Sequence, residues 1–172
     1  DFLNLSRFTP IVRYLDVQRP YAPLPLQPPL RILVAIASPA GYAPLDLERE
    51  RAQIEESWGG QENVEVHFLA PATIMNLHDQ FAERPYHVLH YMGHGDFDAH
   101  TGQGGLVMED DGGDGYMADG SALGVLLRDA PTMRLVFLNA CQSAQAEDDP
   151  TGSVAARLLD EPNGNISEEA RQ

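Results

Sequence analysis

The chain has 172 residues, of which 43% are hydrophobic and 22% charged, a composition typical of one globular domain. Its 11 Lys and Arg stand against 26 Asp and Glu, and the net charge of −15 argues against nucleic acid or an anionic membrane as a partner. No apolar run approaches the roughly 20 residues of a membrane span, and no signal peptide is visible, although the chain begins at Asp1 rather than Met. A single cysteine excludes an internal disulfide. We expect a soluble, acidic, cytoplasmic protein.

The first 29 residues are predicted to form an N-terminal segment and a proline-rich arm. Apolar side chains in residues 1–19 follow no clear period, and residues 20–29 contain five prolines. Proline fixes φ and lacks an N–H group, so this stretch can join neither a helix nor a central strand. We expect an extended arm that leads into one domain over residues 30–160, followed by a polar tail over residues 161–172.

Residues 30–160 alternate short apolar runs with amphipathic segments. The run from Arg31 to Ala37 is almost continuously apolar, which is typical of a strand buried on both faces of a parallel sheet. The β-α-β-α-β order predicts an α/β sandwich with a mainly parallel sheet. Further strands are expected at 64–69, 87–91 and 135–139, a short hairpin at 106–108 that turns through 109–115, and helices at 46–58, 73–84, 121–129 and 151–159.

Two of these strands run into residues with catalytic potential. The strand at 87–91 continues into MGHG around His94, and the strand at 135–139 continues into ACQS around Cys141. Functional groups collect past the carboxyl ends of strands in open α/β sheets, so neighbouring strands would bring both residues to one edge. A thiolate activated by an imidazole is a nucleophile, and the backbone amides of Gly95 and Cys141 could hold a developing oxyanion.

Three blocks of this sequence resemble the CHAT domain, a bacterial member of the caspase/separase-like cysteine peptidases. They are HVLHYMGHGDFD at 87–98, GLVMED at 105–110 and LVFLNACQSA at 135–144, and the opening RILVAIASP also fits. The 47 residues from His94 to Cys141 are close to the roughly 50 found in caspases. The resemblance covers about residues 30–160 and implies a caspase-like three-layer sandwich with a mainly parallel central sheet.

The resemblance also implies an activity and a set of site residues. Cys141 matches the family's nucleophile, His94 its catalytic histidine and Gly95 the position whose amide helps the oxyanion hole. Peptide bonds of a protein substrate would be hydrolysed without metal or organic cofactor, in regulated or defence-type signalling beside repeat or signalling modules. Asn139 stands at a possible S1 or groove position, where several related peptidases carry an acid that binds a basic P1 side chain, so that basis for Arg or Lys preference is absent.

The C-terminal region departs from the family pattern. Caspase-type folds have two further core strands after the cysteine, whereas here 31 residues follow Cys141 and the last dozen are polar. We therefore expect an incomplete domain whose C-terminal half is absent or lies on a second chain. The alternative function is a non-catalytic CHAT-type protein-interaction module or an inactive fragment. A flavodoxin-like small-molecule binder would share the sheet, but the sequence has no ligand fingerprint for one.

Other polar residues are predicted to be structural, and no metal site is expected. His90 and His94 do not form a metal pair in an alternating strand, and no set of Cys, His and acids has zinc spacing. The acidic stretch 109–115 lacks the alternating ligands and terminal glutamate of an EF-hand loop. Asp96 and Asp98 are close enough in sequence to orient the His94 ring, yet solvated loop acids are commoner.

Overall fold

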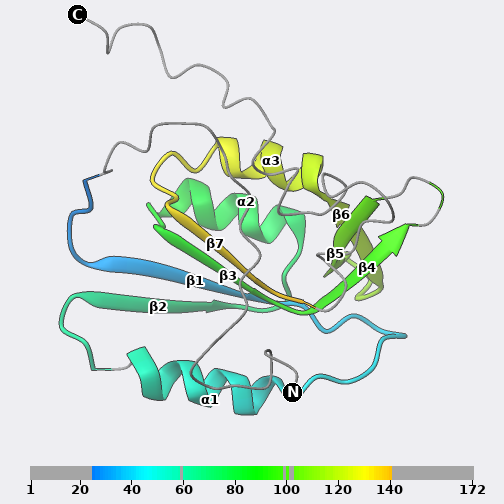
Figure 1. Ribbon diagram of the computed structural model, residues 1–172, viewed down its shortest axis with the longest axis horizontal. Helices are drawn as coiled ribbons and strands as arrows, with labels where there is room; N and C mark the ends of the chain where they lie inside the picture. Colours follow the sequence, from blue (N-terminus) through cyan, green and yellow to red (C-terminus); the bar gives the residue numbers. More distant parts are fainter. Residues whose placement is uncertain (1–24, 59, 99, 101–102, 141–172) are drawn as a thin grey trace, which may run out of the picture.

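The computed structural model describes residues 25–58, 60–98, 100 and 103–140, and Figure 1 shows these residues arranged as three layers. Of the described helices, the one at Leu47–Trp58 covers the lower face of a central sheet, those at Ile74–Glu83 and Gly120–Arg128 cover the upper face, and a small second sheet lies at one end. Among the described residues, no helix is long and apolar enough to cross a bilayer. Most of the predicted N-terminal segment, Cys141, the helix expected at 151–159 and the tail at 161–172 lie outside the described residues.

The central sheet is parallel, with the strand order β2-β1-β3-β7. The small sheet is antiparallel, with the order β4-β5-β6. This mixed α/β architecture confirms the predicted fold class, because a parallel four-stranded sheet flanked by helices is consistent with a caspase-like sandwich. The elements are β1 (Leu30–Ile36), α1 (Leu47–Trp58), β2 (Val64–Leu69), α2 (Ile74–Glu83), β3 (Val88–Met92), β4 (His94–Asp98), β5 (Gln103–Glu109), β6 (Gly115–Asp119), α3 (Gly120–Arg128) and β7 (Leu135–Asn139).

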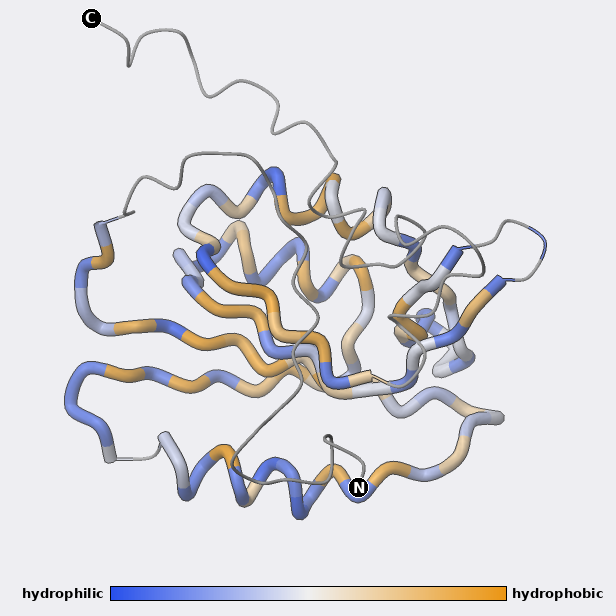
Figure 2. The backbone as a smooth tube through the Cα atoms, viewed as in Figure 1, coloured by the Kyte–Doolittle hydropathy of each residue, from blue (hydrophilic) through white to orange (hydrophobic). Residues whose placement is uncertain are grey.

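Strand β1 is buried on both faces, as its continuous apolar run predicted. Leu33 and Ala35 belong to the larger apolar cluster, which lies between the sheet and helices α2 and α3. Ile32 and Val34 face the other way, into a smaller cluster on the side of α1. Figure 2 shows the same contrast, since the strands of the sheet are largely hydrophobic whereas α1 is mostly hydrophilic. Helix α1 has no fully buried residue, so the layer that it forms is held to the sheet only by partly buried side chains.

Helix α2 begins and ends where the sequence indicates. The Thr73 side chain accepts a hydrogen bond from the backbone N–H of Asn76, 3.0 Å away, which satisfies one of the free amides of the first turn. Leu77 and Phe81 are buried one turn apart against the upper face of the sheet. Arg84 is already extended, as expected for the residue before a proline.

The predicted hairpin is larger than expected. Residues 106–108 lie within β5, which pairs on one side with β6 and on the other with β4. The expectation that Asp96 and Asp98 are loop acids is therefore wrong, because both lie in β4. The sequence HGDFD has no apolar alternation, and its extended conformation comes from pairing with β5 rather than from local preference.

His87 is a buried histidine that the fold keeps neutral. It is 7% exposed, and its Nδ1 accepts a hydrogen bond of 3.0 Å from the backbone N–H of Arg31. Burial lowers the pKa of His87, and the positive charges of Arg31 and Arg134 add to the effect. An unfolded chain, in which histidine titrates near 6.5, takes up this proton at a higher pH than the folded chain does.

We expect the free energy of unfolding to fall as the pH is lowered from about 7.5 to about 5.5, because protons bind to the unfolded state before they bind to His87. The variant H87N retains a side-chain acceptor but does not titrate, so its stability should depend less steeply on pH. Urea unfolding at a series of pH values measures both slopes. Equal slopes for the two proteins would contradict this account.

Candidate active site

His94 is the first residue of β4, and its ring is held by the loop between β1 and α1. Its Nε2 lies 2.7 Å from the carbonyl oxygen of Ala43, and the ring centroids of His94 and Tyr42 are 5.2 Å apart. Because a carbonyl only accepts, Nε2 carries the hydrogen in this contact. In the neutral ring Nδ1 then has the free lone pair, so it is the nitrogen that can accept a proton.

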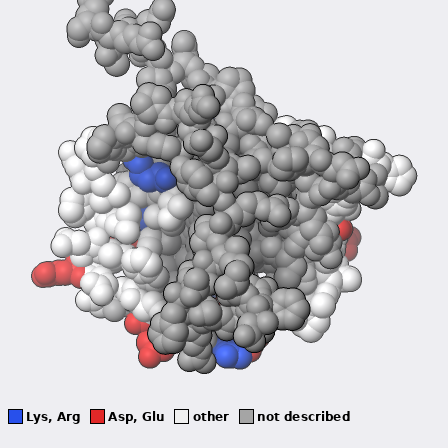
Figure 3. Space-filling model, in the orientation of Figure 1, with Lys and Arg blue, Asp and Glu red and all other residues white. Residues whose placement is uncertain are grey.

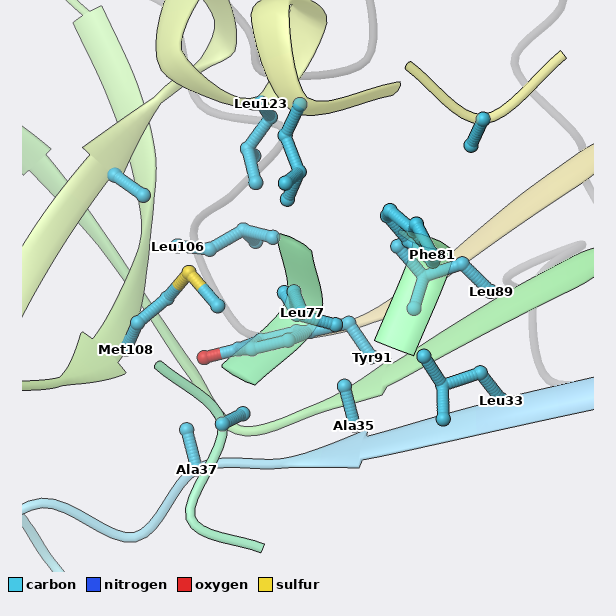
Figure 4. Packing of buried hydrophobic residues seen from close by; sticks show 14 of the residues in the cluster. Leu33, Ala35, Ala37, Leu77, Phe81, Leu89, Tyr91, Leu106, Met108 and Leu123 are labelled. Atoms are coloured by element: carbon cyan, nitrogen blue, oxygen red, sulfur yellow. The ribbon is translucent and has the colours of Figure 1, made fainter. Parts of the chain in front are cut away.

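The backbone at His94 is attached to the core by the hydroxyl of Tyr91. Tyr91 lies on β3 and is 1% exposed, and its Oη is 2.7 Å from the carbonyl oxygen of Val107 and 3.1 Å from that of His94. Figure 4 shows the ring lying across the apolar cluster with its hydroxyl directed towards the small sheet. Burial raises the pKa of Tyr91, so the hydroxyl stays protonated and continues to donate.

Gly93 provides space for a buried side chain. Its φ is not positive, since the described glycines with positive φ are Gly41, Gly60 and Gly113. A Cβ atom on Gly93 would collide with the hydroxyl of Tyr91. The glycine therefore lets a buried tyrosine ring lie against the backbone immediately before the histidine.

The strands that precede His94 and Cys141 are neighbours in the sheet, which is the condition under which both residues were expected at one edge. Strand β3 pairs with β7 in parallel, with Met92 opposite Asn139, and the N–H of Gly93 donates to the carbonyl of Asn139 over 3.3 Å. His94 comes two residues after Met92 in the sequence, and Cys141 comes two residues after Asn139. Cys141 itself lies outside the described residues, so its role as nucleophile and oxyanion donor stays a prediction.

The remaining predicted groups lie close to His94 along β4. Gly95 stands opposite Leu106 in the antiparallel pair with β5. Asp96 and Asp98 accept hydrogen bonds of 2.8 Å from the backbone N–H groups of Phe97 and His100. Among the described residues, no group of three or more His, Cys, Asp and Glu side chains is arranged to hold a metal ion.

Asn139 lies in a hollow between α1 and the lower face of the sheet. The hollow has a volume of about 250 Å³, and the Nδ2 of Asn139 donates to Oε2 of Glu50 over 3.1 Å. The lining residues are Glu50, Gln53, Ile54, Ser57, Trp58, His90 and Asn139. His90 has a buried Nε2 without a hydrogen-bond partner among the described residues, and burial lowers its pKa.

The residues that hold His94 in place were not predicted from the sequence. Ala43 contributes only its backbone oxygen, which every residue type has, so the pattern of side chains in the sequence could not predict this contact. The sequence pattern treats Tyr91 as one more apolar residue of a strand, although a tyrosine in a buried strand is a signal that its hydroxyl needs a partner.

The chain matches a protein-family model. The model of the CHAT domain matches residues 9–159. No curated protein matches the chain. The matched range contains both His94 and Cys141, together with every helix and strand that the structure describes.

Replacing Tyr91 by phenylalanine should lower the free energy of unfolding by about 1–3 kcal/mol, because the Val107 carbonyl loses its donor while it stays buried. Y116F is the matched control, since Tyr116 is 48% exposed on β6 and should change stability by no more than about 0.5 kcal/mol. Denaturant unfolding of the two variants and the wild type measures the difference. Equal stabilities for Y91F and Y116F would show that the hydroxyl does not join the sheets.

Proposed function

Because the chain belongs to the CHAT domain family, which is related to the caspase-like cysteine peptidases, we propose that it hydrolyses peptide bonds of a protein substrate. In this proposal Cys141 is the nucleophile and His94 the general acid and base. The backbone amides of Gly95 and Cys141 stabilise the oxyanion. The protein would act in regulated or defence-type proteolysis.

The observation that carries the proposal is the alignment of β3 with β7. Met92 is paired with Asn139, and His94 and Cys141 each follow this pair by two residues in the sequence. Two residues span at most about 7 Å of extended chain. The pairing therefore supports a nucleophile and a base that start from adjacent strand ends, from which their side chains can meet.

The contact between His94 and Ala43 supports the proton transfers that this chemistry needs. With the hydrogen of Nε2 bonded to the Ala43 carbonyl, Nδ1 can accept the proton of the Cys141 thiol. The thiolate sulfur then attacks the carbonyl carbon of the scissile bond, and the electron pair of the C=O bond moves to oxygen. The Ala43 carbonyl continues to accept from Nε2 when the ring is protonated, so the ring need not reorient between the steps.

The second half of the reaction returns the enzyme to its initial state. Collapse of the tetrahedral intermediate breaks the C–N bond, and His94 gives its Nδ1 proton to the leaving amine. A thioester between the substrate's acyl group and Cys141 remains. Water attacks this thioester as His94 takes one of its protons, and the C–S bond breaks to release the carboxylic acid. The proton on His94 then returns to the sulfur of Cys141.

The test of the dyad is the rate at which iodoacetamide alkylates Cys141, followed by mass spectrometry between about pH 5.5 and pH 9. Cys141 is the only cysteine, so every added mass reports on it. In the wild-type chain we expect fast alkylation near pH 6.5, because an imidazole partner depresses the pKa of a thiol. H94A should react at least about tenfold more slowly at that pH and approach the profile of an ordinary thiol titrating near 8.5.

H78A is the matched control, because His78 lies on α2 with its side chain 53% exposed and pairs with Asp79, away from β4. Its alkylation profile should equal that of the wild type. C141A should abolish cleavage of any peptide pool that the wild-type chain digests. If H94A and the wild type have the same profile, the dyad is wrong and the non-catalytic interaction module is the better account.

A further inference from the structure

The loop between β1 and α1 supplies the carbonyl that holds the His94 ring, yet little of this loop is buried. Between residues 38 and 46, Pro39 is the only fully buried residue, and Ala43 itself is exposed. An exposed loop of this kind has few apolar contacts to fix its conformation. The position of the Ala43 carbonyl therefore depends on the polar and backbone contacts that the loop makes.

The β5–β6 hairpin makes such contacts with alternate residues of the loop. The backbone N–H of Ser38 donates to Oε1 of Glu109 over 2.9 Å. Two residues further on, the N–H of Ala40 donates to the carbonyl oxygen of Gly113 over 2.9 Å, and Ala40 forms a parallel bridge with Asp114. The loop is therefore attached to the same small sheet that carries the histidine.

Tyr42 connects this attachment to the histidine ring. A Cβ atom on Gly115 would lie 2.6 Å from the Tyr42 ring and 3.2 Å from the side chain of Val107, so the tyrosine ring lies directly over the glycine. The register of the small sheet places His94 opposite Val107, on the same face as Gly115. The Tyr42 ring therefore lies against both the β6 backbone and the imidazole, whose centroid is 5.2 Å away.

The contact made by Glu109 depends on a side chain and can be removed by substitution. Among the described residues, no Lys, Arg or His nitrogen lies within 4.0 Å of this carboxylate, so its partner is the Ser38 amide. Figure 3 shows acidic side chains at the right-hand edge of the molecule, where the small sheet lies in Figure 1. A test of Glu109 must therefore separate the lost hydrogen bond from the lost negative charge.

We propose that Glu109 and Tyr42 are positioning residues for His94. Glu109 fixes the start of the loop on the hairpin, and Tyr42 packs against the imidazole one residue before Ala43. Together they keep the Ala43 carbonyl on Nε2, which leaves Nδ1 as the nitrogen that accepts a proton. This role rests on the proposed function, in which His94 is the base.

The experiment measures how fast the hydrogen on Nε2 of His94 exchanges with water, by NMR of the whole chain carrying isotope-labelled histidine. The signal is assigned by its absence from H94Q. A hydrogen bonded to a carbonyl exchanges slowly, so the wild type should give a protected signal. E109A and Y42A should exchange at least about fivefold faster, which is the factor expected for the loss of one typical hydrogen bond.

E109Q and Y42F are the conservative controls. A glutamine oxygen still accepts from the Ser38 N–H, and a phenylalanine ring still covers Gly115, so both variants should keep the exchange rate of the wild type. D111A removes one negative charge at an exposed residue in the turn of the same hairpin, and it should also leave the rate unchanged.

Circular dichroism establishes that each variant is folded. An unprotected wild-type signal, an unchanged rate in folded E109A or Y42A, or a rate in E109Q as fast as in E109A overturns the positioning proposal. The measurement reads the ring of His94 itself and does not require a reactive cysteine. If the alkylation experiment contradicts the dyad, the exchange rates stay as predicted, so failure of the peptidase function and failure of this inference are distinguishable.

Discussion

The hydroxyl of Tyr91 lies where the end of β3 meets the small antiparallel sheet, and both the fold and the candidate site depend on this contact. The hydroxyl donates to the carbonyl oxygen of Val107 on β5 over 2.7 Å, and it lies 3.1 Å from the carbonyl oxygen of His94 on β4. A polar group buried to this extent costs free energy unless it is hydrogen-bonded, so the contact favours this arrangement of the two sheets. The same contact fixes where the histidine leaves the core, and Gly93 provides the space that the ring needs.

The two helical layers differ in how strongly they are attached to the sheet. The upper layer buries Leu77 and Phe81 of α2 and Leu123 of α3 in one apolar cluster with β1 and β3. Among the described residues the lower layer is helix α1, which has no fully buried residue and a mostly polar surface. Within this part of the chain, α1 leaves part of the sheet face uncovered. That incomplete packing produces the hollow beside Asn139 and leaves Phe137 of β7 53% exposed.

Backbone carbonyl groups make the contacts that hold His94 and the ends of β3 and β7 in place. The Ala43 carbonyl holds the imidazole, and the Asn139 carbonyl accepts from the Gly93 amide, which links the ends of β3 and β7. Side chains such as Asp96 and Asp98 instead satisfy nearby amides of their own segment. Holding a side chain by backbone groups costs little additional conformational entropy, because the strands that carry those groups are already fixed by the sheet.

The sequence alone was sufficient to predict the elements whose residues have a clear period or cap. The strands at 64–69 and 135–139 and the helix that Thr73 caps lie where they were predicted, because apolar alternation, capping and proline act over a few residues. The same local signals placed His94 after one strand and Cys141 after another, and motif resemblance connected the two blocks to the family.

The tertiary structure determines the strands and contacts that depend on residues far apart in the sequence. The segment HGDFD became a strand only through its pairing with β5, and Glu50 reached Asn139 only because α1 packs across the lower face of the sheet. The contact of His94 with Ala43 spans 51 residues and involves a backbone oxygen that any residue type would supply. Such contacts are set by the arrangement of whole elements. They follow from the packing of the sheet and its helices, and no local pattern of residue types encodes them.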